Sequence, residues 1–297
     1  MTIPNLSFIG ERINPGFKST RAMLDANDIP GIQALAVKQA EAGAAYLNVN
    51  VDLLRAKKDP QYLIGIIEAI QDVVDIPLSF DFPDLTAQQI CLKTYDPAKA
   101  GGKKPIINSI CETRWEIMEA ARIQPVRLLV MSSEALVNGA GVQCKTADAM
   151  VATTKRMVEK MLGGDYGLVI DDLIVDVAVA TLSSDTEGRT RAALETVKRI
   201  HADPELKGIH MSAGLSNLAI QLPSVEIDGK PFKLQLESAF LTLAVPHGFD
   251  MVLGTPGRAY EMLPEDNTVL AAFKEIIEMD GMQALRALRK LYTGARK

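Results

Sequence analysis

The stretch that decides the fold is the first apolar run, Phe8-Ile-Gly-Glu-Arg-Ile-Asn-Pro-Gly16. Its apolar part is typical of a buried parallel strand. A doubly wound open sheet usually places a Gly-x-Gly-x-x-Gly turn after its first strand, and this chain has Glu11-Arg-Ile-Asn14 there instead. Further apolar runs also end in polar residues. The sequence predicts strands at residues 8–13, 45–51, 77–82, 105–110, 126–132, 168–174, 208–213 and 250–254.

Amphipathic stretches alternate with these strands. Apolar residues recur at helical spacing in residues 32–44, 62–74, 87–95, 115–123, 147–162, 190–201, 236–245 and 269–292. Strands and helices that alternate eight times imply a closed (β/α)8 TIM barrel, which typically takes about 250 residues. We therefore expect an α/β protein in which residues 1–297 form a single barrel domain.

Composition excludes several classes of protein. The chain has 32 basic and 37 acidic residues, mixed along its length, which does not suit a nucleic-acid or membrane-surface partner. No apolar run approaches the roughly 18 residues of a membrane span, and the first residues lack the features of a signal peptide. The three cysteines are sparse and widely spaced, which fits a reducing cytoplasm.

Polar residues at successive strand ends should converge on one mouth of the barrel. Asp81 follows the third strand, Asn108 the fourth, and Asp171 is placed at the end of the sixth. An ionised carboxylate can accept paired hydrogen bonds from an N–H beside an NH2, as on an amino-pyrimidinone, and an amide offers both a donor and an acceptor. The mixture favours a flat heterocycle. Each residue taken alone could instead be a helix cap or a satisfied polar group.

Asn217 is the candidate for chemistry, in the segment Gly214-Leu-Ser216-Asn217 after the seventh strand. Its amide can donate a hydrogen bond to a nitrogen whose charge changes in the transition state. Gly214 permits close backbone approach to a ligand. Glu11 can supply a proton through water, or it can be a structural partner of Arg12.

Other kinds of site are not indicated. The histidines, His201, His210 and His247, share no ligand spacing, so no metal site is expected. There is no Gly-x-Ser-x-Gly and no phosphate-binding loop. Residues 225–234 alternate around Asp228-Gly229, which predicts a hairpin. We expect it over the barrel mouth, as decoration or as a lid or docking surface.

Six motifs, in order, resemble those of the pterin-binding methyltransferases, and most closely the methyltetrahydrofolate:corrinoid protein methyltransferases. They are Gly10-Glu-Arg-Ile-Asn14, Leu47-Asn-Val-Asn-Val51, Phe80-Asp81, Ile107-Asn-Ser109, Ile170-Asp-Asp-Leu-Ile174 and Gly214-Leu-Ser-Asn217. The resemblance implies a TIM barrel, usually a homodimer. It also implies transfer of a methyl group between N5 of tetrahydrofolate and the cobalt of a corrinoid, a cobalamin carried by a partner protein.

The motifs also imply roles for residues. Asp81, Asn108 and Asp171 would bind the pterin ring with Gly214 and Ser216, and Asn217 would hydrogen-bond N5. Glu11 would act with them, and Asn14, Asn48 and Asn50 would complete the site or face the corrinoid. Two departures stand out: Asn48 replaces an expected acid, and Asp171-Asp172 stands where Asp-Pro is usual.

Two alternatives remain open from the sequence. A dihydropteroate synthase would use the same pocket, but the Arg-x-His pattern expected at the eighth strand and the Asp-Ser-Phe after the first are both absent. A non-catalytic pterin-binding protein would also fit. No Asp-x-His-x-x-Gly cobalamin signature occurs, so the corrinoid is expected on a separate protein. The sequence leaves open the direction of transfer and the source of the methyl group. It also leaves open whether the pterin substrate is tetrahydrofolate or tetrahydromethanopterin.

Overall fold

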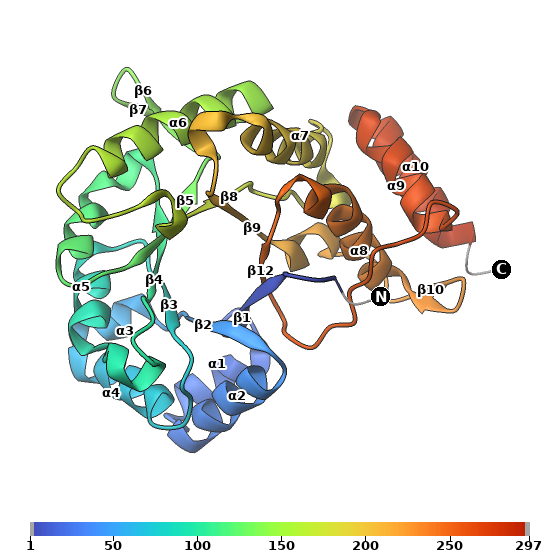
Figure 1. Cartoon of the computed structure of the whole chain (residues 1–297). Coiled ribbons are helices and arrows are strands. Elements are labelled where there is room, and N and C mark those ends of the chain that lie inside the picture. Colours follow the sequence, from blue (N-terminus) through green and yellow to red (C-terminus); the bar gives the residue numbers. More distant parts are fainter. Residues whose placement is uncertain (1–2, 295–297) are drawn as a thin grey trace.

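The computed structural model describes residues 3–294, and within them eight parallel strands close into a barrel (Figure 1). Neighbouring strands follow the chain order, and the last pairs with the first. The fold is therefore the predicted (β/α)8 barrel. Its strands are β1 Ser7–Ile13, β2 Ala44–Val49, β3 Leu78–Asp81, β4 Ile106–Ile110, β5 Arg127–Met131, β8 Leu173–Asp176, β9 His210–Gly214 and β12 Met251–Gly254.

Helices surround the barrel on its outer side (Figure 1). They are α1 Lys18–Asp25, α2 Ile29–Glu41, α3 Leu53–Lys58, α4 Pro60–Gln71, α5 Leu85–Thr94, α6 Ala147–Leu162, α7 Arg189–Ala202, α8 Phe232–Ala244, α9 Thr268–Glu278 and α10 Gly281–Gly294. The helix predicted at 115–123 lies in the 3₁₀ segment η2, Glu112–Arg122. The single helix predicted at 269–292 is two helices, because the left-handed backbone of Gly281 (φ +59°) separates α9 from α10.

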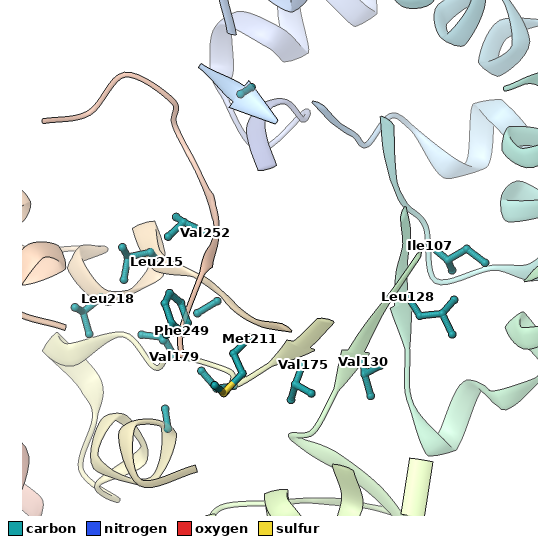
Figure 2. Close-up of a cluster of buried hydrophobic side chains, with 14 of the residues drawn as sticks. Ile107, Leu128, Val130, Val175, Val179, Met211, Leu215, Leu218, Phe249 and Val252 are labelled. Atoms are coloured by element: carbon teal, nitrogen blue, oxygen red, sulfur yellow. The ribbon is translucent and has the colours of Figure 1, made fainter. Parts of the chain in front are cut away.

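Side chains on the outer face of the strands pack against the helices and form the main core. Figure 2 shows part of this layer, with side chains from neighbouring strands side by side: Ile107 of β4, Leu128 and Val130 of β5, Val175 of β8, Met211 of β9 and Val252 of β12. All six are buried. Strands covered on one side by helices and on the other by the barrel interior explain the near-continuous apolar runs of the sequence.

A second, smaller cluster fills the inside of the barrel. Its members come from strands on opposite sides, which is possible only in the interior: Ile9, Ile106, Leu129, Ile174 and Met251. Because side chains alternate along a strand, residues two positions further on also face inward, at the carboxyl end. This periodicity directs Glu11, Asn108 and Asp176 toward the mouth. Register adds Asp81, which pairs with Asn108.

The sixth strand of the barrel begins at Leu173, not at the predicted Leu168. Gly167 has a left-handed backbone (φ +66°), and residues Ile170–Asp172 form the 3₁₀ helix η3. The side chain of Asp172 accepts the N–H of Val169 at 3.1 Å and pairs with Lys104 at 2.6 Å. These contacts turn the first apolar residues out of the sheet, so the prediction for residues 168–172 was wrong.

Two hairpins extend the barrel. The predicted one is present as β10 Glu226–Ile227 and β11 Lys230–Pro231, with positive φ at Asp228 and Gly229 as a type I′ turn requires. It lies at the outer edge of the barrel near α10, and not over the centre of the mouth as expected (Figure 1). The second, β6 Glu134–Val137 and β7 Ala140–Gln143, follows β5 and was not predicted.

Candidate functional site

Polar side chains ring the carboxyl-terminal mouth of the barrel. Asp81 ends β3, Asn108 lies in β4, and Asp176 ends β8. Glu11 lies in β1, two residues beyond Ile9 of the interior cluster and on the same face of the strand. Predicted polar residues from separate strands therefore do meet at one place, with Asp176 in the position expected of Asp171.

Asp81, Asn48 and Asn108 form one hydrogen-bonded chain. The Nδ2 of Asn108 donates to Oδ1 of Asn48 at 3.1 Å, and Nδ2 of Asn48 donates to Oδ2 of Asp81 at 3.1 Å. Ser79 also donates to Oδ1 of Asn48, and Asn50 donates to the same oxygen of Asp81. Asn48 thus uses both ends of its amide to orient its neighbours. An acid here, as the resemblance led us to expect, would set a second carboxylate against Asp81.

The same chain leaves acceptors free. Both donors to Asp81 use Oδ2, and no protein donor within residues 3–294 reaches its other oxygen. Oδ1 of Asn108 is likewise without a protein donor in the described chain, because only its Nδ2 is engaged. These two acceptors lie on adjacent strands in register. They can therefore take hydrogen bonds from a ligand that presents neighbouring N–H groups.

Asp176 faces the mouth from β8, which β5 separates from β4. Among the described residues, its carboxylate accepts one hydrogen bond, from the N–H of Ala178 at 2.7 Å. Burial without a cationic partner raises the pKa of this carboxyl to about 6, and the Ala178 N–H only partly opposes that rise. A partly buried carboxylate is stabilised by further donors. Asp176 is therefore suited to receive donors from a ligand.

Asp171, which the sequence placed in the pocket, lies at the other end of the barrel. It belongs to η3, before β8, and its side chain is 76% exposed. Its contacts are His210, at 3.2 Å, and Arg127, both at the amino ends of their strands. The placement of Asp171 at the mouth was wrong because the strand starts later than its apolar run suggested. Sequence reasoning missed Asp176, although Leu173-Ile-Val-Asp176 is also an apolar run that ends in an acid.

Glu11 is fixed by two hydroxyl groups. Ser216 donates to its Oε2 at 2.9 Å and Thr255 donates to its Oε1 at 2.8 Å. The alternative partner Arg12 stacks on Phe17 instead, with its guanidinium carbon 3.9 Å from the ring centroid. Glu11 is thus held in the mouth by segments that follow β9 and β12.

Asn217 is exposed, and its side chain has no hydrogen-bond partner within residues 3–294. It lies over Gly214: a Cβ at Gly214 would come within 2.8 Å of Nδ2 of Asn217. The glycine therefore makes room for this amide. Asn14, in contrast, is occupied, because its Oδ1 accepts the N–H of Gly16 at 2.7 Å in a local turn.

A buried acid beside this site was not predicted. Glu237 of α8 is 1% exposed, accepts the hydroxyl of Tyr260 at 2.7 Å and pairs with Arg258 at 3.0 Å. Burial raises the pKa of Glu237, Arg258 opposes the rise, and the charge of nearby Glu11 adds to it. The only sequence signal was one glutamate in an otherwise apolar helix.

Within the described residues, no three His, Cys, Asp or Glu side chains gather around one point. His210 begins β9 at the amino end of the barrel, and His201 and His247 lie together at the ends of α7 and η7, Val245–His247. Within the same residues, no helix is long and apolar enough to cross a membrane.

Known proteins resemble this chain in sequence. Residues 10–253 match the family described as "Pterin binding enzyme". A methylcorrinoid:tetrahydrofolate methyltransferase of Eubacterium limosum is 25% identical over 256 residues, which cover 84% of each chain.

Solved structures of dihydropteroate synthases share the fold. The enzyme of Thermus thermophilus has a TM-score of 0.57 at 16% identity, covering 86% of this chain and 90% of its own. That of Vibrio fischeri has a TM-score of 0.57 at 17% identity, covering 93% and 94%. These identities show the barrel and nothing finer. Because the family match spans most of the chain, including the strand ends that carry Asp81, Asn108 and Asp176, this protein belongs to the pterin-binding enzyme family.

Proposed function

We propose that this protein is a methyltransferase that moves a methyl group between N5 of methyltetrahydrofolate and the cobalt of a corrinoid carried by a partner protein. The proposal rests on three side chains at the same mouth. The carboxylates of Asp81 and Asp176 can each accept further hydrogen bonds, and the side-chain amide of Asn217 has no hydrogen-bond partner in the described chain. The name of the Eubacterium limosum relative supports the same reaction.

The carboxylates would hold the heterocycle. Free oxygens of Asp81 and Asp176 accept from the N–H and NH2 groups on the pyrimidinone edge, from two strands of the barrel. Oδ1 of Asn108 accepts from a donor between them. Asn48 keeps Asp81 and Asn108 in this geometry through its bonds of 3.1 Å to each. These contacts position the ring and leave its N5 side open toward the mouth.

Asn217 would act at N5. A tertiary amine is a poor methyl donor because, when the bond from the methyl carbon to nitrogen breaks, the nitrogen leaves as an anion unless a proton reaches it. A hydrogen bond from the amide of Asn217 stabilises the charge that develops there. Glu11, held by Ser216 and Thr255, would deliver a proton to this region through water. The corrinoid of the partner supplies the metal nucleophile that accepts the methyl group.

A dihydropteroate synthase reaction would need cations that bind pyrophosphate, and two cations in the segments that follow β9 and β12 are already paired with carboxylates. Arg258 is neutralised by Glu237 at 3.0 Å, and Lys230 of β11 by Glu261. A pyrophosphate would have to compete with these carboxylates. The alternative is a second outcome of the test below.

The test is a spectroscopic methyl-transfer assay with methyltetrahydrofolate and cob(I)alamin. The proposal expects loss of the cob(I)alamin absorption and growth of methylcobalamin, in proportion to the amount of protein. A parallel assay supplies 4-aminobenzoate and a dihydropterin pyrophosphate. Turnover only in the second assay would identify a synthase and contradict the proposal.

Binding must be measured in the same preparation by calorimetry. A protein that binds methyltetrahydrofolate but does not turn over should be assayed again with a corrinoid protein. If it still transfers no methyl group, a non-catalytic pterin-binding protein is the correct description.

A further inference from the structure

Arg114 is a half-buried cation without an anionic partner. It follows β4 by four residues, in η2, and its backbone departs from helical geometry (φ −129°, ψ 41°). Its Nε donates to Sγ of Cys111 at 3.1 Å and its Nη2 to Sδ of Met131 at 3.3 Å. No carboxylate within residues 3–294 pairs with it. Its guanidinium is thus held in place by two sulfur atoms.

The two acids nearest to it in the fold have other hydrogen-bond partners. Glu112 forms a bidentate salt bridge with Arg156, with N···O distances of 2.9 and 3.1 Å, and also accepts a hydrogen bond from the N–H of Leu136. Glu134 accepts the hydroxyl of Thr113. Sulfur is a weak acceptor, and a guanidinium has five N–H donors, so most of the hydrogen-bonding capacity of Arg114 is unused.

The position of Arg114 is beside the candidate pterin site. Met131, which it contacts, ends β5 and pairs in register with Asp176 on β8. Cys111, its other contact, follows Ile110 at the end of β4, the strand that carries Asn108. The guanidinium therefore lies on the rim of the mouth, near the ends of the strands that carry Asn108 and Asp176.

We propose that Arg114 binds an anionic group of a ligand in the mouth, a carboxylate or phosphate that lies outside the bound heterocycle. The inference rests on the proposed function. Burying a charge without a partner is unfavourable, and the planar fork of arginine matches two oxygens of such an anion. The acids of the pocket, Asp81 and Asp176, take the donor edge of the ring, and Arg114 takes the opposite charge at the rim.

Two ligands of the proposed reaction carry such an anion. A folate ends in the carboxylates of its glutamate, on the part of the molecule that leaves the pocket. A complete cobalamin carries a phosphate in its nucleotide loop, which cobinamide lacks. The shared chemistry is an anion with two accessible oxygens, and the experiment separates the sources.

The first arm measures dissociation constants by calorimetry for methyltetrahydrofolate and for 5-methyltetrahydropterin, which has no benzoylglutamate. The variants are Arg114→Gln, which removes the charge, and Arg114→Lys, which keeps it without the fork. The matched control is Arg122→Gln at the far end of η2, where Arg122 pairs with exposed Asp165. The second arm measures methyl transfer to cobalamin and to cobinamide.

The expected result is a loss of about tenfold in affinity for the folate in Arg114→Gln, a smaller loss in Arg114→Lys, and none in Arg122→Gln. Affinity for the tailless pterin should not change. A loss confined to transfer to cobalamin, with cobinamide unaffected, would assign the anion to the corrinoid and also support the site.

Equal losses for both pterins and both acceptors would overturn the inference and make Arg114 a structural residue. The inference would also be overturned if the wild-type protein bound the two pterins equally well and transferred methyl groups equally well to cobalamin and cobinamide. This comparison does not depend on the folding of a variant. A wild-type protein that binds neither pterin would overturn the proposed function, and this inference with it.

Discussion

The two ends of the barrel treat charge in opposite ways. At the amino end, His210 contacts Asp250 at 2.5 Å and Asp171 at 3.2 Å, and Lys104 pairs with buried Asp172 at 2.6 Å. At the carboxyl end, Asp176 has one backbone donor, and Asp81 has an oxygen without one. The first end is saturated by its own partners. The second is left for a ligand.

The contrast shows how one fold separates stability from function. A (β/α)8 barrel tends to hold its chemistry at the carboxyl ends of its strands and its stabilising contacts at the amino ends. Here the difference can be read in hydrogen bonds. Charges that satisfy one another stabilise the barrel, whereas a desolvated carboxylate such as Asp176 costs stability until a ligand supplies donors. Substitutions at the two ends should therefore change different quantities.

The largest effect should come from Asn217→Ala at the mouth. Loss of a donor that acts on developing charge typically costs about 100-fold in rate. Because the amide bonds to nothing else in the described protein, the dissociation constant of methyltetrahydrofolate should hardly change. Single-turnover transfer and calorimetry measure the two quantities. Equal losses in rate and in binding would remove Asn217 from the transition state.

Asn48→Asp should sharpen the comparison by setting two acids side by side at the mouth. The introduced carboxylate cannot donate a hydrogen bond to Asp81. In the wild type, Nδ2 of Asn48 lies 3.1 Å from Oδ2 of Asp81, and two negative charges this close repel each other. We expect affinity for methyltetrahydrofolate to fall about tenfold, because the repulsion disturbs the carboxylate that would bind the ring. Asn27→Asp, an exposed change beside Arg55, is the control. An unchanged affinity would mean that Asn48 does not position Asp81.

At the amino end, Lys104→Met should cost stability and spare binding. The substitution leaves the carboxylate of Asp172, 4% exposed, with only the N–H of Val169. Breaking a fully buried pair costs about 3–5 kcal/mol, and because Lys104 is partly exposed we expect roughly 2 kcal/mol. Urea denaturation measures this loss. A weaker affinity for methyltetrahydrofolate with intact stability would contradict the division of labour between the two ends.

The smallest effect should be a pH dependence from His210. Its hydrogen bond to Asp250 raises its pKa, burial and Arg127 oppose the rise, and Asp171 assists it. Because the folded pKa is raised, the stability it contributes is fully present below the unfolded value of about 6.5. It is lost as the pH rises through the folded value. The advantage of wild type over His210→Gln in free energy of unfolding should shrink in that direction. A constant or growing advantage would assign another role to the pair.

Much of the fold could be predicted from local pattern. Seven of the eight strands and the Asp228-Gly229 hairpin were located, and the sixth strand was predicted too early, because continuous apolar runs and turn residues report on burial and backbone conformation but not on where pairing begins. The second hairpin was missed although Asn138-Gly139 offered the same signal. The break at Gly281 was missed because an amphipathic pattern can continue across two helices.

The functional site was harder to predict from the sequence than the fold. Asp81, Asn108, Glu11 and Asn217 do lie at the mouth. The sixth strand was misplaced because its start depends on the contact of Asp172 with Lys104, far apart in the chain. The salt bridge of Glu237 with Arg258 and the contact of Arg114 with the sulfur of Met131 could not be predicted for the same reason, because the partners are far apart in the sequence. Periodicity shows which face of a strand is buried, but not which charges meet.

The most direct test of this account compares Asp176 with Asp171, the aspartate that the sequence analysis assigned to the pterin site. Affinity for methyltetrahydrofolate should be measured by calorimetry for wild type, Asp176→Asn and Asp171→Asn near pH 8, well above the pKa of about 6 of Asp176. We predict a loss of about tenfold or more for Asp176→Asn and none for Asp171→Asn. Weakened binding in Asp171→Asn, with Asp176→Asn unaffected, would contradict it.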